Sequence, residues 1–303
     1  MSHDLKSPME NWPYILKNLL ASSSAPPVLP SFLLNPNRIT STVKDLKSPL
    51  SKKWNPLFHG SIQRRLALHT RKNIQRIRNI TNGLTMPEIT TVPIGSAKKM
   101  VAAILFFDLE NFTATTSKLS NDIVLYMLNT IIPEMIHIVR YWNGEVEKNT
   151  GDGLMAIFGT ETRNNFLIAR DAIEAAMAIR YVMLSDIHPK FADEGISVLD
   201  FRIGIDMDEV LVSRIGIKNT NFLTVVGGAA NRASKLQNLA ESNGISIGEN
   251  LYSNLHPLLY RYCKERAHED WTWQYPETKT PYRFFHYEAN WPDPKEWRKM
   301  RCN

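Results

Sequence analysis

The N-terminal part of the chain lacks the regular hydrophobic pattern that the remainder shows. Residues 1–60 are rich in Pro, Ser and Asn, and only Trp12–Leu20 reads as a short amphipathic helix. Residues 61–80 form a basic helical candidate with apolar positions at roughly helical spacing. Such helices contact nucleic acid or membrane surfaces in some proteins, but more often their Arg side chains lie over their own domain. We therefore predict a leader over residues 1–95 and a main domain over residues 96–303.

From Lys98 on, hydrophobic runs of strand character alternate with stripes at the helical period. Thr116–Tyr141 carries a long helical stripe, in which Pro133 predicts a break or a helix start. Asn164–Leu184 is a second helical stripe, and its many small residues predict close packing against a sheet. The order is strand, helix, helix, hairpin, helix, strand pair, strand, helix and strand. This order predicts an α+β sandwich with a mainly antiparallel sheet and helices packed on one face.

Two of these hydrophobic runs end at an acidic residue. Asp108 ends the first run, and Asp152 is flanked by Gly151 and Gly153 in the hairpin that follows. Either residue alone reads as a helix cap or a turn residue. Two carboxylates at the ends of neighbouring strands, however, suit a pair of hard cations such as Mg²⁺ or Mn²⁺. The sequence therefore predicts a metal site formed by Asp108 and Asp152.

The turn after Asp108 leads directly into a predicted helix. Successive backbone N–H groups at such a helix start form an anion site. We expect phosphate contacts there and a solvent-facing Glu110, with the first residue of the turn also touching the metal. The residues assigned to the phosphates are Leu109, Asn111, Phe112 and Thr113, and Leu109 is the additional metal contact.

Four segments resemble, in order and spacing, those of class III nucleotidyl cyclases. The resemblance extends over roughly residues 98–290, and it implies a ferredoxin-like βαββαβ fold and a homodimer whose active sites are shared between subunits. The segments are Phe107–Thr113, Lys148–Gly153, Phe201–Ile205 with Glu209–Val212 (a strand pair), and Thr224–Asn231 (a strand, turn and helix).

The resemblance also implies individual catalytic roles. Asn231 would orient the ribose, and the residue four positions later would stabilise charge on the α-phosphate. That position holds Lys235 where the family has Arg. The positive charge is kept, but the two parallel N–H donors of a guanidinium are lost. Arg232 lies about 100° further round the helix and does not replace it. Two divalent cations per site, Mn²⁺ or Mg²⁺, would be bound by the two acidic residues.

Base selection is implied by two further positions, Lys148 and Thr224, which contact the base in the family. This pair speaks against GTP and allows ATP. Three features differ from those of an ordinary adenylate cyclase and resemble the bacterial pyrimidine cyclases of the Pycsar anti-phage systems instead. They are the sequence of the turn Gly227–Asn231, the lysine at position 235 (Lys235), and a cyclase domain that follows a short basic leader. We expect UTP to be converted to cyclic UMP and pyrophosphate, as a messenger for a separate downstream effector.

Several alternatives remain open from the sequence. CTP or ATP are the other candidate substrates. A diguanylate cyclase is disfavoured, since Thr150–Gly153 occupies the place of its signature hairpin. A catalytically dead binding module would be expected to lose a metal carboxylate, yet Asp108 and Asp152 are both present.

Composition adds little that conflicts with this interpretation. The formal charge of +6 over 303 residues suits a polyanionic nucleotide without requiring nucleic acid. Cys263 and Cys302 offer no disulfide framework, which indicates a reducing cytoplasm. We expect no membrane span, because no apolar run approaches the roughly 18–20 residues needed, and no signal peptide.

Overall fold

The structure, a computed structural model, describes residues 60–67, 97–159, 164–217 and 219–291. All of them belong to one compact unit, Pro49–Asn303. The predicted helix Trp12–Leu20 lies outside the described residues, and so does most of the predicted leader. The boundary at residue 95 therefore stays a prediction.

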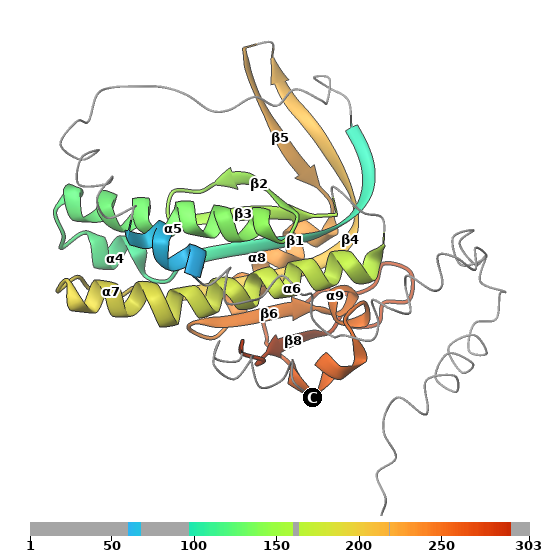
Figure 1. The fold of residues 1–303 in the computed structure, drawn as a ribbon. Coiled ribbons are helices and arrows are strands. Elements are labelled where there is room, and N and C mark those ends of the chain that lie inside the picture. Colours follow the sequence, from blue (N-terminus) through green and yellow to red (C-terminus); the bar gives the residue numbers. More distant parts are fainter. Residues whose placement is uncertain (1–59, 68–96, 160–163, 218, 292–303) are drawn as a thin grey trace, which may run out of the picture. The chain divides into compact units, whose positions relative to one another are not determined.

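One eight-stranded sheet organises the fold (Figure 1). Its order is β2-β3-β1-β4-β6-β8-β7, with β5 paired to β4 alone. The β4–β6 pair is parallel, and the other named strand pairs are antiparallel. The strands are β1 (Ala97–Leu109), β2 (Gly144–Asn149), β3 (Gly153–Phe158), β4 (Phe201–Ile217), β5 (Thr220–Val226), β6 (Gly244–Gly248), β7 (Cys263–Arg266) and β8 (Phe284–Tyr287).

The helices complete an α+β architecture of the predicted ferredoxin-like kind. They are α4 (Phe112–Thr116), α5 (Asn121–Tyr141), α6 (Asn165–Val182), α7 (His188–Asp193), α8 (Gly228–Leu239) and α9 (Glu249–Ser253), with a π-turn at Met183–Ile187 and a 3₁₀ helix at Pro257–Tyr262. Asn164 caps α6 by accepting hydrogen bonds from two backbone N–H groups, which explains where this helix begins.

Helices cover both faces of the sheet, so the prediction of one covered face is wrong. Residues alternate between faces along a strand: Leu105 of β1 belongs to the core under α5 and α6, whereas Ile104 packs with Ala229 and Ala233 of α8. Gly204 of β4 permits the approach of α8, since a Cβ atom there would lie 2.2 Å from the Ala233 carbonyl oxygen. Figure 1 shows α8 behind β1, with α5 and α6 in front.

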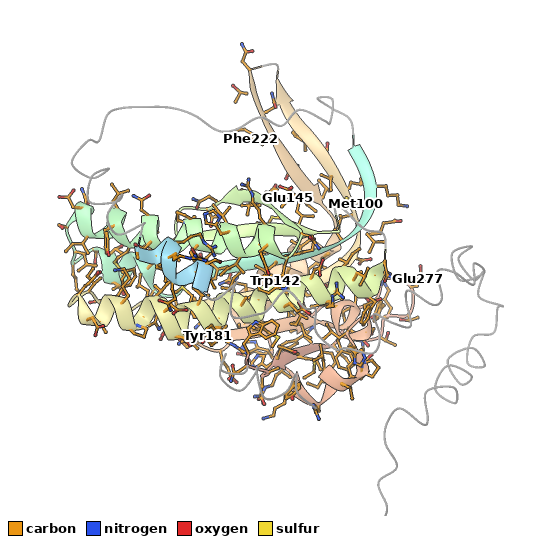
Figure 2. All side chains as sticks on the ribbon, in the orientation of Figure 1. Met100, Trp142, Glu145, Tyr181, Phe222 and Glu277 are labelled. Atoms are coloured by element: carbon orange, nitrogen blue, oxygen red, sulfur yellow. The ribbon has the colours of Figure 1, made fainter. Side chains whose placement is uncertain are left out.

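Two element predictions need correction. Pro133 neither breaks nor starts a helix, because α5 runs through it and is buried on both sides of it, at Met127 and Ile138. The predicted strand pair Phe201–Ile205 and Glu209–Val212 is one strand, β4, of 17 residues. Its second half pairs with β5 and forms a hairpin that extends beyond the sheet; Phe222 lies on this hairpin (Figure 2).

The helix at residues 60–67 is part of the same domain. Its Ile62 and Leu66 belong to the buried core. Arg65 donates to both carboxylate oxygens of Glu134, with Nη2–Oε1 at 2.6 Å and Nε–Oε2 at 3.1 Å. The interpretation that Arg side chains of this segment lie over their own domain is confirmed for Arg65.

Helix α5 corrects the prediction about apolar length. It has 21 residues, and an 18-residue stretch within it has a mean hydropathy of 1.4, which is long and apolar enough for a membrane span. In this fold its apolar residues serve another purpose, since Met127, Ile131, Met135 and Ile138 are fully buried within the domain. The buried Glu134 lies on the same helix and pairs with Arg65.

Candidate active site

Asp108 and Asp152 come together where β1 meets the β2–β3 hairpin. The Cα of Asp108 lies opposite that of Gly153 in the antiparallel β1–β3 pair. The hairpin turn is held by a Thr150 N–H to Gly153 carbonyl hydrogen bond of 2.9 Å. Gly151 has φ 102°, a conformation that favours glycine. The sequence interpretation of a strand end facing a tight hairpin is therefore correct.

The two carboxylates interact electrostatically. Burial raises the pKa of Asp108 to about 6, and the neighbouring charge of Asp152 contributes to the rise. Gly153 is packed against the same side chain, since a Cβ atom there would lie 2.6 Å from Asp108 Oδ1. Two hard oxygen donors whose mutual repulsion a cation would relieve fit a divalent metal well.

Asp108 and Asp152 are the side-chain donors that the described residues bring together here, and the predicted metal contact of Leu109 stays a prediction. The described parts of the chain contain no cluster of three or more His, Cys, Asp or Glu side chains suited to a metal. Mg²⁺ in enzymes is often held by one or two carboxylates together with substrate phosphates and water. Asp108 and Asp152 therefore fit an ion that shares its coordination with a ligand.

The turn after Asp108 has the expected strand–turn–helix form. Leu109 is the buried last residue of β1, and α4 begins at Phe112. Asn111 precedes it in the left-handed region, at φ 54°. Thr113 is exposed in the first turn of α4. Phosphate binding by these residues stays a prediction.

Glu110 does not face solvent, so that prediction is wrong. Its side chain is only 19% exposed and pairs with Arg202 at 2.5 Å, and it accepts a hydrogen bond from Ser242 Oγ at 2.6 Å. Arg202 comes from β4 and Ser242 from the turn between α8 and β6, which the local sequence around Glu110 does not reveal.

Helix α8 presents Asn231 and Lys235 one turn apart, after the turn at Gly227. Asn231 is exposed and Lys235 is partly exposed. Neither forms a hydrogen bond or ion pair with Asp108 or Asp152 among the described residues of this chain. One chain thus contains both halves of the predicted site, without joining them by such a contact.

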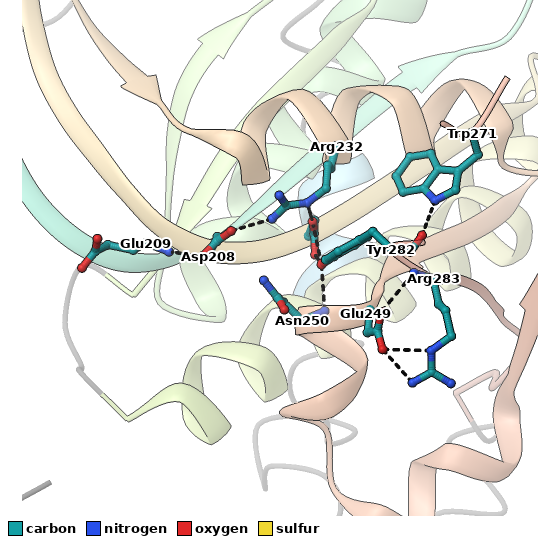
Figure 3. Close-up of polar contacts among 9 residues, drawn as sticks. Asp208, Glu209, Arg232, Glu249, Asn250, Trp271, Tyr282 and Arg283 are labelled. Carbon is teal, nitrogen blue, oxygen red and sulfur yellow. Dashed lines mark hydrogen bonds and ion pairs between the residues drawn. The ribbon is translucent and has the colours of Figure 1, made fainter. Parts of the chain in front are cut away.

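Arg232 is buried, and the sequence analysis missed what surrounds it (Figure 3). Its guanidinium pairs with Asp206 and, at 2.8 Å, with Asp208, both on β4. Its Cζ also lies 4.5 Å from the ring centre of Tyr282. These contacts engage Nε and Nη2 of the guanidinium. That Arg232 does not replace the family Arg at Lys235 stays a prediction.

The same cluster fixes α8 in place. The Tyr282 hydroxyl donates to Asp206 Oδ1 at 2.8 Å and accepts from the Asn250 backbone N–H at 2.8 Å. Burial raises the pKa of Asp206 to about 6, although Arg232 lowers it in part. A buried ion pair with additional hydrogen bonds holds a defined geometry. Asp206 and Tyr282 therefore position the helix that carries Asn231 and Lys235.

The predicted base-contacting residues meet around a third residue, Glu147. The Lys148 side chain is 47% exposed, whereas that of Glu147 is only 2% exposed. Glu147 accepts hydrogen bonds from the Thr224 side chain and the Val225 backbone N–H. Burial raises its pKa, while Lys148 and these hydrogen bonds lower it in part. No sequence motif pointed to Glu147.

This arrangement of sheet and helices is that of a class III nucleotide cyclase domain. Residues 95–270 match the family described as the adenylate and guanylate cyclase catalytic domain. The match covers more than half of the chain, and the protein belongs to this family. Members of the family generally use divalent metal ions.

Curated relatives include pyrimidine cyclases. The chain is 35% identical over 150 residues to a cytidylate cyclase of Staphylococcus aureus, covering 48% of this chain and 36% of the relative. It is 30% identical over 163 residues to a uridylate cyclase of Burkholderia cepacia, covering 53% of this chain and 69% of the relative. The chain thus spans little more than a third of the cytidylate cyclase.

Solved cyclases share the fold. The adenylyl cyclase CyaB from P. aeruginosa superposes with a TM-score of 0.57 at 22% identity, over 65% of this chain and 98% of that one. A guanylyl cyclase domain from the aquatic fungus Blastocladiella emersonii, described as a non-canonical dimer, superposes with a TM-score of 0.50 at 19% identity, over 63% of this chain and 98% of that one. These likenesses confirm the predicted fold class.

Proposed function

We propose that the protein is a pyrimidine nucleotide cyclase, which converts UTP to 3′,5′-cyclic UMP and pyrophosphate. The observation that carries this proposal is the pair Asp108 and Asp152, held together at the strand ends of a cyclase domain. The relatives that act on pyrimidine nucleotides support the base class. The choice of UTP over CTP is our prediction from the sequence.

The chain's own side chains divide the work of the reaction. Asp108 and Asp152 would hold two divalent cations, which acidify the ribose 3′-hydroxyl and neutralise the triphosphate when bound. Backbone N–H groups of residues 109–113 would hold the β- and γ-phosphates. Asn231 would orient the ribose, and Lys235 would stabilise charge on the α-phosphate. The 3′-oxygen then displaces pyrophosphate from the α-phosphorus.

A homodimer with shared sites is part of this proposal. The β4–β5 hairpin carries exposed apolar side chains on one face, since Leu211 lies opposite Val226 and Ile215 lies opposite Phe222. Phe222 is 54% exposed. Apolar patches of this kind commonly mark interfaces, and a second copy would cover this face while bringing its Asn231 towards the first copy's carboxylates.

Offered equal ATP, GTP, CTP and UTP with Mn²⁺, the purified protein should form mainly cyclic UMP. Chromatographic separation of the products measures this directly. Exclusive cyclic AMP would instead make it an adenylate cyclase, with Lys148 and Thr224 as purine contacts. Absence of any cyclic product would favour a catalytically dead module and overturn the proposal.

Metal activation should depend on pH through Asp108. Its pKa of about 6 lies above the ordinary 3.8, so a proton competes with the cation below pH 6. The Mn²⁺ concentration for half-maximal activity should rise about tenfold per pH unit between pH 6 and 5, and change little above pH 7. A Mn²⁺ titration at each pH measures this, and an unchanged requirement at pH 5 would contradict it.

Without bound metal, the contribution of the Asp108 carboxyl to the free energy of unfolding falls as the pH rises from about 4 through 6.

The biological setting follows from the same proposal. The cytoplasm is the compartment we propose, because nucleoside triphosphates are available there. We propose that the cyclic product acts as an anti-phage second messenger through a separate effector. Product formation only after phage infection of a host carrying the gene would test this role.

A further inference from the structure

Glu147 is a buried carboxylate whose hydrogen bonding is incomplete. Its side chain is 2% exposed, and its Oε2 atom has no hydrogen-bond partner among the described residues. The Lys148 ammonium forms an ion pair with this oxygen at 3.6 Å, a distance longer than that of a direct hydrogen bond, and it lowers the pKa of the carboxyl in part. The carboxylate is held in place by the Thr224 side chain and the Val225 backbone N–H.

A local irregularity in β2 gives Glu147 this position. The pairing of β2 with β3 shifts register between Val146 and Lys148, which leaves Glu147 as the unpaired residue of a β-bulge. A bulge redirects side chains and commonly occurs beside functional sites. The simple alternation expected from the sequence therefore fails at this residue, and Glu147 reaches β5.

An unsatisfied buried carboxylate oxygen is unfavourable for folding. Leaving a buried charged acceptor without a donor costs more than leaving a neutral one, and such groups in native proteins call for an explanation. A ligand that supplies the missing donor is one such explanation. Thr224, which holds the carboxylate, lies on the exposed face of the β4–β5 hairpin between Phe222 and Val226. A ligand that supplies the missing donor would therefore approach Glu147 from the exposed, largely apolar face of this hairpin.

We propose that Glu147 selects the base of the nucleotide by accepting a hydrogen bond from an N–H group on its pairing edge. This inference rests on the proposed function and deepens it. The matching donor is N3–H in uracil or the 4-amino group in cytosine. Each has an acceptor beside it, to which Lys148 donates. Lys148 is half exposed and pairs with Glu147 at 3.6 Å, so its ammonium lies beside the carboxylate and is accessible to a ligand.

This assignment differs from the one made on the sequence alone. The sequence assigned the base contacts to Lys148 and Thr224. We now assign the base contacts to Glu147 and Lys148, and Thr224 is a positioning residue that orients the Glu147 carboxylate. The Glu147 carboxylate is a hydrogen-bond acceptor, and the Lys148 ammonium beside it is a donor. A base that presents a donor next to an acceptor satisfies both groups, whereas a base edge with carbonyl oxygens facing Glu147 would be repelled.

The test compares wild type with Glu147→Gln on UTP and on CTP. The preferred nucleotide identifies which N–H group is the donor. For that nucleotide, KM should rise about 10- to 100-fold in the variant, because a hydrogen bond to a charged acceptor is lost, while kcat changes less. The same nucleotide methylated until no N–H remains on that nitrogen (N3-methyl-UTP or N4,N4-dimethyl-CTP) should be about 10- to 100-fold poorer for wild type, and methylation should cost Glu147→Gln little more.

Glu145→Gln is the matched control, since Glu145 is an exposed carboxylate two residues earlier on β2 (Figure 2). Its constants should stay within about twofold of wild type. Thr224→Val, which removes the positioning hydroxyl, should raise KM in the same direction; it replaces Glu147→Gln if that variant does not fold. Wild-type constants in Glu147→Gln, or equal use of the methylated nucleotide by wild type, would overturn the inference. Wild type inactive on every nucleotide would overturn the proposed function instead.

Discussion

Replacing Asp152 by Ala should lower cyclase activity by at least about a thousandfold while the domain stays folded. The side chain lies in a hairpin turn and is partly exposed, so its removal leaves the hydrophobic core untouched. It supplies one of the two carboxylates that fit the metal, and Asp108 alone is a poor site for divalent cations. Initial rates with saturating Mn²⁺ and the thermal unfolding midpoint measure the two parts of this expectation.

Controls for this result come from the same hairpin and from metal removal. Glu145→Ala removes an exposed carboxylate on β2 and should keep near-wild-type activity. The wild-type enzyme should lose its activity in excess chelator and regain it with Mn²⁺ at least as well as with Mg²⁺. Full turnover in excess chelator would show that Asp108 and Asp152 do not act through a metal.

Co-expression of Asp108→Ala and Asn231→Ala chains should restore up to about a quarter of wild-type activity. In the proposed dimer, each variant alone would have both sites damaged. About half of randomly mixed dimers are heterodimers, and each heterodimer keeps one intact site if the carboxylates and Asn231 of a site come from different subunits. Activity of the co-purified mixture, with each chain carrying a different affinity tag, measures the recovery.

A second pair of variants tests whether recovery requires that the two chains are damaged in different halves of the site. Asp108→Ala combined with Asp152→Ala should give no recovery, since both changes affect the carboxylate half and every heterodimer site carries one of them. The two co-expressions differ only in which half of the site is damaged. An Asp108→Ala and Asn231→Ala mixture that stays inactive, although heterodimers form, would rule out sites shared between subunits.

The predictions from local patterns succeeded where the deciding interactions are local. Asp108 was placed at a strand end and Asp152 in a glycine-flanked turn because strand periodicity and turn residues act over a few positions. The turn before α8 was found in the same way, and so was the long helix α6. Helix geometry also placed Arg232 away from the face shared by Asn231 and Lys235.

The predictions failed where the deciding partner lies far away in the chain. Glu110 was expected in solvent because its neighbours do not reveal Arg202, its partner on β4. Pro133 was expected to interrupt a helix, but burial of α5 on both sides of it outweighs the local cost. The second covered face of the sheet was missed because nothing near Gly204 shows that α8 packs on it.

The sequence by itself determined the order of the elements from β1 to α6, the acidic residues at the strand ends and the cyclase family, since each depends on residue types at short, regular spacing. The tertiary structure alone decided that Arg232 is bound to Asp206 and that Glu147 reaches Thr224. Both contacts join segments remote in the sequence, and the second also depends on a β-bulge that breaks the alternation of β2. Long-range packing therefore selects which polar side chains are buried, and local periodicity contains no information about that choice.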